Sequence, residues 1–368
     1  MENNHKIAIF ASFSGQGGVE RIILNLAEGL SAKGCNVDLI LAKKDSPHLK
    51  KTQASFNLID FGKKHTFSCI PALVRYLKQN QPTAMLAAKD RANQAVIMAR
   101  FIAGVQTRIV VRMGTTVSAA IKRKNILSRL TWYIPMRILY PKADSIIAVS
   151  HGVANDMKKI TRVSGEKMEI VPNPVITDNM MHLSHENVNH PWFADHNLPI
   201  IIGSGRLTRQ KDFPTLIKAF AEVNREFPSR LVILGDGKDR ASLLSLADEL
   251  EISENIYMPG FVANPYAYIS KADLFVLSSI WEGSPNVLTE ALALGIPVVS
   301  TDCPSGPREI LSKGKYGELV PMGDTISLSK AILRTLKKTR PSKESMLKAV
   351  SEYTIEASTS RYYEILTR

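Results

Sequence analysis

Short apolar runs alternate with stretches of helical periodicity along almost the whole chain, and this alternation constrains the fold more than any other feature. Apolar runs of about five residues, bounded by Gly, Pro or polar clusters, are typical of buried strands. Parallel strands need helical crossovers, so the pattern predicts an α/β fold. The 368 residues are too many for one ordinary domain and fit two.

The expected strands form two series. The first comprises Lys6–Phe10, Asn36–Leu41, Phe56–Asp60, Thr83–Ala87, Thr107–Arg112 and Ser145–Val149. The second comprises Ile200–Gly203, Arg230–Leu234, Ile256–Met258, Leu274–Leu277, Pro297–Ser300 and Glu318–Val320. We predict two Rossmann-like doubly wound domains, 1–180 and 195–351, with a linker at 181–194 where periodicity is lost. Because ligands bind beyond the carboxyl ends of such strands, two facing domains would form a deep interdomain cleft.

Positive charge is concentrated in the first half of the chain. The whole sequence has a net charge of +13, and residues 1–175 contain 26 lysines and arginines against 11 aspartates and glutamates. The remaining residues contain 21 against 23. A basic half attracts nucleic acid, an anionic membrane surface or a phosphorylated substrate. A basic surface that serves only solubility fits the same counts.

The segment 119–140 is where basic, aromatic and aliphatic residues alternate at helical spacing. Its charged and aromatic members are Lys122, Arg123, Lys124, Arg129, Arg137, Trp132, Tyr133 and Tyr140. In one interpretation the aromatic rings lie in a lipid headgroup layer while the cations meet anionic lipid. In the other, Ile126, Leu130 and Ile138 pack onto the first sheet and the charges face water. Both interpretations remain open at this point.

Other features of the sequence restrict its class. No apolar run approaches the ~18 residues of a membrane-spanning helix, and the run 7–10 is too short for a signal peptide. Cys35, Cys69 and Cys303 are scattered, so we expect neither a disulfide framework nor a zinc site. We therefore expect a cytoplasmic protein, attached at most peripherally to the inner face of a membrane.

The stretch from Trp281 to Pro297 has the strongest chemical signal. A helix is expected to begin here, because Ser284 is a good N-cap and Pro285 suits the first helical position. The unpaired N–H groups of such a helix start favour a phosphate. Glu282 precedes the helix and Glu290 lies more than one turn inside it, so two carboxylates can bind hydroxyls at separate points of one ligand. The same residues also fit an ordinary helix start with two solvated glutamates.

Two further loops follow expected strands. The loop 203–213 places Arg206 and Lys211 at the carboxyl end of a strand, where two cations can neutralise a diphosphate, unless this is simply a solvated basic loop. The glycine-rich turn 14–21, with Gly17 and Gly18, suits an anion or the close approach of another domain. It departs from G-x-G-x-x-G and gives little support to a dinucleotide site.

In combination these motifs resemble the retaining glycosyltransferases of family 4, which have the GT-B fold of two Rossmann-like domains. The resemblance covers about residues 7–321. In the second half it rests on Gly205-Arg-Leu-x4-Lys211, Leu234-Gly-Asp-Gly237, Pro259-Gly-Phe261, Ala272-Asp273, Glu282-x7-Glu290 and the segments 291–299, 301–310 and 314–321. In the first half it rests on Gly17-Gly-Val-Glu-Arg21, Val149-Ser150 and Val171-Pro-Asn-Pro174. Residues 361–366 look like the family's terminal helix, which assigns 352–368 to the first domain.

The resemblance implies that the second domain holds a nucleotide sugar and the first an acceptor. Arg206 and Lys211 would bind the donor diphosphate and stabilise it as it leaves. Glu290 would bind the ribose hydroxyls, and Glu282 would bind the transferred sugar. The other residues implied in donor binding are Gly17, Gly18, Gly205, Gly260, Phe261, Gly283, Ser284, Asn286 and Val287.

On the acceptor side the chain departs from the family pattern. Many members carry a histidine after the fifth strand of the first domain, and here Arg112 stands near that place. Arginine cannot act as a base, so Arg112 would bind an acceptor or donor phosphate, unless it is only a surface residue at a strand end. His151 is a further polar residue expected to face the cleft.

The activity implied by the resemblance is transfer of a hexose or N-acetylhexosamine, with retention, from a nucleotide diphosphate sugar to a glycan or a lipid-diphosphate-linked acceptor. The family usually needs no metal or other cofactor. The segment 303–308 resembles bacterial surface-polysaccharide members, which favours a UDP-linked donor. The alternatives are a nucleotide-sugar epimerase on the same fold and a basic nucleic-acid-binding protein. We expect no nucleic-acid partner, because no RNA-binding or helix-turn-helix pattern is visible.

Overall fold

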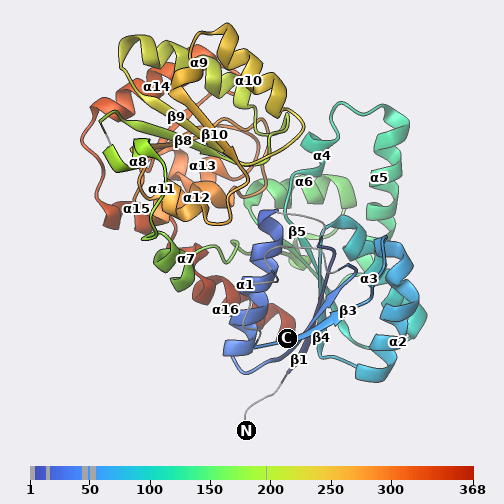
Figure 1. The fold of residues 1–368 in the computed structure, drawn as a ribbon. Coiled ribbons are helices and arrows are strands. Elements are labelled where there is room, and N and C mark those ends of the chain that lie inside the picture. Colours follow the sequence, from blue (N-terminus) through green and yellow to red (C-terminus); the bar gives the residue numbers. More distant parts are fainter. Residues whose placement is uncertain (1–4, 14–16, 44–48, 50–54, 196) are drawn as a thin grey trace. The chain divides into compact units, whose positions relative to one another are not determined.

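The computed structural model describes residues 5–13, 17–43, 49, 55–195 and 197–368 (Figure 1). The chain divides into two compact units. Unit 1 comprises Met1–Val175 and Glu352–Arg368, and unit 2 comprises Ile176–Ser351. Each unit is built on its own sheet, and every strand pair in both sheets is parallel.

Within the described part of unit 1, the sheet has seven strands in the order β3-β2-β1-β4-β5-β6-β7. The strands are β1 (Lys6–Ala11), β2 (Asn36–Leu41), β3 (Asn57–Asp60), β4 (Ala84–Ala88), β5 (Arg108–Met113), β6 (Ser145–Ala148) and β7 (Met168–Ile170). The helices are α1 (Gly18–Ala32), α2 (Ile70–Asn80), α3 (Asp90–Ala103), α4 (Val117–Ala120), α5 (Ile126–Leu139), α6 (His151–Thr161) and α16 (Ile355–Thr367).

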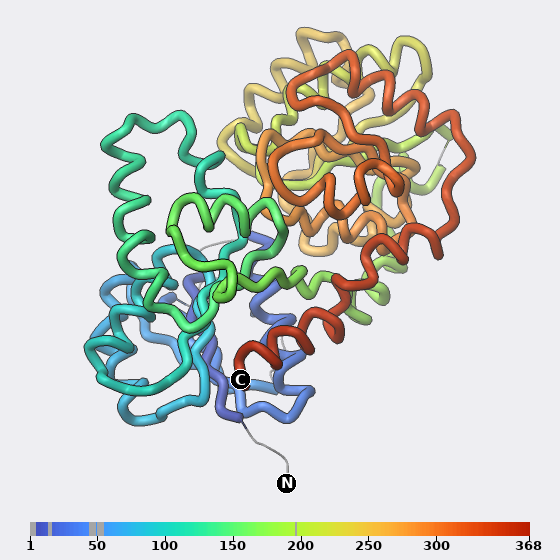
Figure 2. Tube along the Cα trace, turned by 180° about the vertical axis from the view of Figure 1, so that it is seen from behind, coloured from blue at the N-terminus to red at the C-terminus, as the bar shows by residue number. Residues whose placement is uncertain are grey.

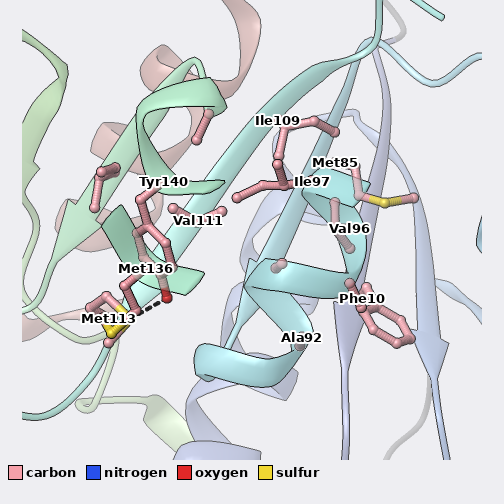
Figure 3. Packing of buried hydrophobic residues seen from close by; sticks show 14 of the residues in the cluster. Phe10, Met85, Ala92, Val96, Ile97, Ile109, Val111, Met113, Met136 and Tyr140 are labelled. Atoms are coloured by element: carbon pink, nitrogen blue, oxygen red, sulfur yellow. Dashed lines mark hydrogen bonds between the residues drawn. The ribbon is translucent and has the colours of Figure 1, made fainter. Parts of the chain in front are cut away.

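Apolar side chains cover both faces of this sheet, because successive residues of a strand point to opposite faces. Ala8 and Phe10 of β1 join the cluster that includes residues of α2, α3, α5 and α6, as the close view in Figure 3 shows in part. Ile7 and Ile9 join the other cluster, formed with α1 and α16. Figure 2 shows the C-terminal helix, in red, returning to the first strands of the chain. Both faces are therefore buried, as parallel sheets require.

Unit 2 has a described sheet of six strands in the order β10-β9-β8-β11-β12-β13. The strands are β8 (Ile200–Ser204), β9 (Arg230–Leu234), β10 (Ile256–Gly260), β11 (Leu274–Leu277), β12 (Val298–Thr301) and β13 (Glu318–Val320). The helices are α7 (Asp178–Leu183), α8 (Pro191–Asp195), α9 (Phe213–Glu226), α10 (Arg240–Glu249), α11 (Pro265–Ile269), α12 (Asn286–Ala293), α13 (Pro307–Ile310), α14 (Thr325–Lys337) and α15 (Lys343–Ala349).

The predicted α/β class with two Rossmann-like sheets is confirmed. All twelve predicted strands form, with their ends shifted by at most two residues. The strand β7, which sequence reasoning missed, is only three residues long and half-buried, so it lacks a distinct apolar run. In the part of the chain that the structure describes, no helix combines the length and apolarity needed to span a membrane.

The predicted linker at 181–194 is wrong, because this segment is packed into unit 2. Asn264 donates a hydrogen bond to the carbonyl of Leu183 at 2.8 Å, and Ser270 donates one to the carbonyl of Ser184 at 2.7 Å. The ring of His190 stacks on that of Tyr257 with 3.9 Å between centroids. A polar, aperiodic segment can thus be fixed by side-chain contacts that leave no periodic signal. The boundary between the units falls at Val175, earlier than predicted.

Candidate active site

The candidate active site lies in unit 2 at the carboxyl edge of the sheet, where β8 and β11 are neighbours. From this pair the strand order runs outward in both directions, through β9 and β10 on one side and β12 and β13 on the other. This is the topological switch point at which ligands bind in open α/β sheets. The loops after β8 and β11 carry Arg206, Lys211 and Glu282, so the sheet topology itself assembles the residues predicted from their motifs.

A buried ion pair joins these two loops. The Nζ of Lys211 lies 2.8 Å from Oε1 of Glu282, and the two side chains are 14% and 9% exposed. The hydroxyl of Ser279 donates to the same carboxylate oxygen at 2.7 Å. Withdrawing two charges from water is costly unless each has a partner, so each residue fixes the other in place. The sequence motifs predicted both residues here but gave no sign that they contact each other.

Backbone contacts hold the same loops together around the ion pair. Ser278 donates its hydroxyl proton to the carbonyl of Lys211 at 2.7 Å. Gln210 donates from its side chain to the carbonyl of Trp281 at 3.0 Å and accepts from the backbone N–H of Ile280 at 2.8 Å. Because main chain and side chains are both tied, the charged groups have little freedom to rearrange. Preorganised charge of this kind is what stabilises a developing anion most effectively.

The loops after β8 and β9 approach each other so closely that only glycine fits between them. A Cβ atom on Gly235 would lie 2.0 Å from the carbonyl oxygen of Gly205, and one on Gly237 would lie 2.3 Å from that of Leu207. Two backbone hydrogen bonds of 2.9 Å also join these loops. The N–H of Gly205 donates to the carbonyl of Leu234, and the N–H of Leu207 donates to the carbonyl of Asp236. Leu234-Gly-Asp-Gly237 is therefore a structural part of this site.

The start of α12 differs from the prediction. The helix begins at Asn286 with Pro285 as its N-cap, and no side chain caps it. The expected cap by Ser284 is therefore wrong, since Ser284 lies one position before the N-cap. Its Oγ is buried and has no hydrogen-bond partner among the residues that the structure describes. Buried hydroxyls are normally satisfied, so this group is available to a ligand at the helix start.

The two glutamates of the motif are both buried, which rules out the interpretation in which they are solvated. Glu282 is 7% exposed and Glu290 is 2% exposed. Arg206 is exposed, and its side chain makes no hydrogen bond or ion pair with the described residues, although its backbone carbonyl accepts from the N–H of Thr208 at 2.8 Å. Phe261, after the end of β10 at Gly260, is 37% exposed. These residues share one edge of the sheet, and Lys211 and Glu282 are in direct contact there.

The remaining donor-side residues fall into two groups. Gly283, Asn286 and Val287 surround the start of α12, and a Cβ on Gly205 would lie 2.6 Å from Cε of Lys211. Gly17 and Gly18 belong to unit 1, at the N-cap and first residue of α1. The rest of the predicted glycine-rich turn, residues 14–16, lies outside the described residues.

Arg112 lies near the end of β5, as the sequence placed it, but its side chain has other surroundings than expected. Its side chain is buried in unit 1, with an exposed fraction of 2%. Its Nε donates to the hydroxyl of Tyr362 on α16 at 3.0 Å, and its NH2 group donates to Oδ1 of Asn173 at 2.5 Å. The interpretation of Arg112 as a surface residue is wrong, whereas its role as a phosphate ligand stays a prediction, against which its burial and its two protein partners count. Its side chain points to the face of the sheet that α16 covers, and its guanidinium is used to hold that helix.

His151 is exposed at the first position of α6, just beyond β6. The preceding Ser150 is the N-cap, and its hydroxyl accepts from the backbone N–H of Val153 at 3.2 Å. His151 therefore lies at the carboxyl edge of the sheet in unit 1. Within the described residues no group of three or more His, Cys, Asp or Glu side chains is arranged to hold a metal ion.

The three cysteines are predicted to be unreactive in the folded protein. All are buried free thiols. Burial raises the pKa of Cys303 to about 12, with nearby Glu282 raising it further and Lys211 opposing the shift, and burial also raises the pKa of Cys35 and Cys69. At pH 8 the folded chain should react with a disulfide reagent much more slowly than free cysteine. Three thiols should titrate in denaturant, and fast labelling of the native chain would contradict the burial.

Two family models match the chain, one over each half. "Glycosyltransferase Family 4" matches residues 16–179 and "Glycosyl transferases group 1" matches residues 186–355. A curated relative, the N-acetylgalactosamine-N,N'-diacetylbacillosaminyl-diphospho-undecaprenol 4-alpha-N-acetylgalactosaminyltransferase of Campylobacter jejuni, is 31% identical over 341 residues, 90% of each chain. The lipopolysaccharide core biosynthesis glycosyltransferase LpsE of Rhizobium meliloti is 26% identical over 96% of this chain and 97% of its own.

Solved structures agree in fold. The structure of Anabaena HepE in complex with UDP and glucose superposes with a TM-score of 0.81 at 17% identity, covering 99% of each chain. The lipopolysaccharide outer core galactosyltransferase WaaB superposes with a TM-score of 0.73 at 20% identity, covering 98% of this chain and 99% of its own. Since both family models match and a 31% identical relative is covered almost throughout, the chain belongs to the family 4 glycosyltransferases and has their GT-B fold.

Proposed function

We propose that this glycosyltransferase moves a hexose or N-acetylhexosamine, with retention of anomeric configuration, from a UDP-linked sugar to a glycan or lipid-diphosphate-linked acceptor. The observation that carries the proposal is the buried ion pair of Lys211 and Glu282 at the switch point of the unit 2 sheet. The pair fixes a cation next to a carboxylate, which suits a ligand that has both a diphosphate and sugar hydroxyls.

Each residue of the site has one role in the proposed reaction. Lys211 and the exposed Arg206 bind the diphosphate and stabilise the negative charge that grows on it as the glycosidic bond breaks. Glu282 orients the transferred sugar, and Glu290 binds the ribose hydroxyls. The acceptor hydroxyl attacks the same face that the diphosphate leaves, and a leaving phosphate oxygen takes its proton. Two basic side chains supply the electrostatic stabilisation, so the proposal requires no metal.

The relatives support the choice of substrates. The Campylobacter relative is named for an acceptor linked through diphosphate to undecaprenol, and LpsE for lipopolysaccharide core biosynthesis. HepE was solved with UDP and glucose. We extend these properties to this chain as part of the proposal, and we place its reaction in the synthesis of bacterial surface polysaccharide.

Donor binding should appear as thermal stabilisation. At a concentration of 100 times its dissociation constant, a bound ligand adds about 2.7 kcal/mol to the free energy of unfolding. We expect UDP-sugars to raise the melting temperature more than GDP- or ADP-sugars do. Glu290→Ala, and the more conservative Glu290→Gln, should abolish this shift, whereas Glu222→Ala on the exposed face of α9 should leave it unchanged. A full shift in both Glu290 variants would refute its assignment to the ribose.

The exposed aliphatic side chains of α5 favour peripheral attachment to a membrane. The sequence suggested that the aromatic residues would make this contact. Tyr140 is fully buried and hydrogen-bonded to Met113 (Figure 3), and Trp132 and Tyr133 pack against the core. The predicted headgroup role is therefore wrong for Tyr140, and it stays a prediction for the partly buried Trp132 and Tyr133. The opposite prediction fails as well, because the aliphatic side chains do not pack onto the sheet. They form an exposed stripe, defined here as the α5 stripe: Ile126, Leu127, Leu130, Ile134 and Ile138.

We propose that the α5 stripe docks on an anionic membrane at the cytoplasmic face. The stripe follows Lys122, Arg123 and Lys124 along the chain, and all three cations are exposed. Aliphatic side chains that enter the acyl boundary beside cations that meet anionic headgroups are typical of peripheral helices. Phe101 and Ile102, at the end of the neighbouring α3, extend the exposed apolar surface.

Vesicle binding tests this attachment. The double variant Leu127→Gln with Ile134→Gln should bind phosphatidylglycerol vesicles about tenfold less tightly, because each lost aliphatic contact is worth on the order of 1 kcal/mol. Leu244→Gln, at an exposed leucine of α10 in unit 2, is the matched control. Binding of the wild type should weaken with salt and be poor on phosphatidylcholine vesicles. Equal binding to both lipids would count against an anionic membrane partner.

A further inference from the structure

Unit 1 contains a cavity, lined by both polar and apolar side chains, that no predicted site residue occupies. It lies between α4, α5 and α6 and has a volume of about 370 Å³, within the range of small-molecule sites. Tyr133 and Arg137 line it from α5, and Asn155, Asp156 and Lys159 line it from α6. Because α6 begins just beyond β6, the lining residue Gly152 in its first turn lies at the carboxyl edge of the sheet, where α/β proteins bind ligands.

The carboxylate of Asp156 is built into the wall of the cavity. Asp156 is 8% exposed, and its Oδ2 accepts a hydrogen bond from the backbone N–H of Ser118 at 3.1 Å. This bond ties the start of α4 to α6 and fixes the orientation of the carboxylate. A carboxylate accepts more than one hydrogen bond, so a fixed Asp156 beside the amide of Asn155 is suited to the hydroxyls of a sugar.

The opposite wall comes from α5. Tyr133 is partly buried against the core, and burial, together with the nearby charge of Asp156, raises the pKa of its hydroxyl. The hydroxyl therefore stays protonated and can donate a hydrogen bond, while the ring offers an apolar surface to a pyranose. Arg137 donates from Nε to the carbonyl of Ile160 at 2.8 Å, which holds its guanidinium at the cavity.

The charge balance of the cavity favours an anionic group next to the hydroxyls. Arg137 and Lys159 contribute two cations and Asp156 one anion, a net of +1. A neutral sugar has no anionic group to pair with Arg137 and Lys159. An inorganic anion has no hydroxyl groups to donate to the carboxylate of Asp156. A phosphorylated sugar matches both: its hydroxyls meet Asp156 and Asn155, and its phosphate meets Arg137 and Lys159.

The cavity also adjoins the α5 stripe. Tyr133 and Ile134 are consecutive residues, as are Arg137 and Ile138, so the cavity wall and the exposed stripe occupy neighbouring faces of one helix. A ligand with a phosphosugar head in the cavity can therefore lay a hydrocarbon chain along the stripe. A lipid-linked acceptor requires a polar binding site next to an apolar surface, and the cavity and the α5 stripe provide both.

We propose that this cavity binds the sugar-phosphate head of the acceptor. The proposal rests on the proposed function, since it assigns to unit 1 the acceptor of the same glycosyl transfer. It also replaces Arg112 as the phosphate-binding residue of the acceptor side with Arg137 and Lys159.

Binding of a defined probe to the full chain tests the cavity. The probe is N-acetylglucosamine 1-phosphate, measured by calorimetry beside N-acetylglucosamine and inorganic phosphate. We expect the phosphosugar to bind most tightly, and Lys159→Ala and Asn155→Ala each to weaken it about tenfold. Lys158→Ala is the matched control, because it removes the same charge from the neighbouring exposed position of α6, outside the cavity. Equal weakening in Lys158→Ala, no effect of Lys159→Ala and Asn155→Ala, or no binding by the wild type would overturn the proposal.

A second arm separates a lipid-linked source from a free phosphosugar. A long-chain alkyl ester of the same sugar phosphate should bind more tightly than the parent compound, and Ile134→Gln should remove only that gain. No gain from the alkyl chain would overturn the lipid-linked form of the proposal. UDP-sugar stabilisation of the same variants is measured in parallel. If UDP-sugars still stabilise the cavity variants and these variants bind the probe normally, the cavity assignment is wrong but the proposed function stands. If UDP-sugars do not stabilise the wild type, the proposed function itself is wrong.

Discussion

Replacing Lys211 by alanine is expected to slow release of the nucleotide from the donor by about two to three orders of magnitude, the loss typical of removing one fixed charge-stabilising group from an active site. Its Nζ lies 2.8 Å from Glu282 and is mostly buried, so the substitution removes a positive charge that is fixed in position. The same change leaves Glu282 buried without this partner. We therefore also expect the free energy of unfolding of unit 2 to fall by about 3 to 5 kcal/mol.

A second substitution separates the two effects. Adding Glu282→Gln to Lys211→Ala removes the buried negative charge that Lys211 had balanced, so most of the lost stability should return while the rate stays low. The measurements are denaturant unfolding and nucleotide release from the UDP-sugar that stabilises the wild type. Lys218→Ala, at an exposed lysine of α9, is the matched control and should change neither quantity. A Lys211→Ala variant whose rate stays within about threefold of the wild type would contradict the diphosphate role.

The sequence predicted most of the sheet and most of the donor-side motif, for a physical reason. Buried parallel strands are continuous apolar runs, so β2, β9 and β11 could be placed to the residue. Lys211 and Glu282 were found because they follow such strands, and parallel topology then brings the loops together at one edge. At this site the residues predicted from the local sequence pattern are the ones that the strand order of the sheet brings together.

The failures share a different cause, since each depends on a partner distant in sequence. Arg112 bonds to Tyr362, which is 250 residues away, and nothing near position 112 reveals it. The segment 181–194 is fixed by Asn264 and Ser270 of a later helix and loop. On α5, periodicity showed that one face is apolar, but not which face the core would cover. Met136 and Tyr140 are buried, whereas Ile126, Leu130 and Ile138, which one interpretation placed on the sheet, are exposed.

Arg112→Ala should therefore destabilise unit 1 without touching donor binding. The substitution removes a large buried side chain and the donors to Tyr362 and Asn173. A cavity together with lost buried hydrogen bonds is expected to cost about 3 to 5 kcal/mol. Because Tyr362, Ile365 and Leu366 of α16 belong to the same core cluster, we expect that helix to loosen first and to become accessible to proteases.

The outcome distinguishes a structural role from phosphate binding. Limited proteolysis should cleave within 355–367 in Arg112→Ala but not in Arg75→Ala, which removes an exposed arginine of α2. Tyr362→Phe should show a weaker version of the same effect, since it removes one bond and keeps the ring. The folded fraction of Arg112→Ala should retain the UDP-sugar shift and the affinity for N-acetylglucosamine 1-phosphate. A stable Arg112→Ala protein with a selective loss of phosphosugar affinity would return Arg112 to the acceptor site and remove the need for Arg137 and Lys159.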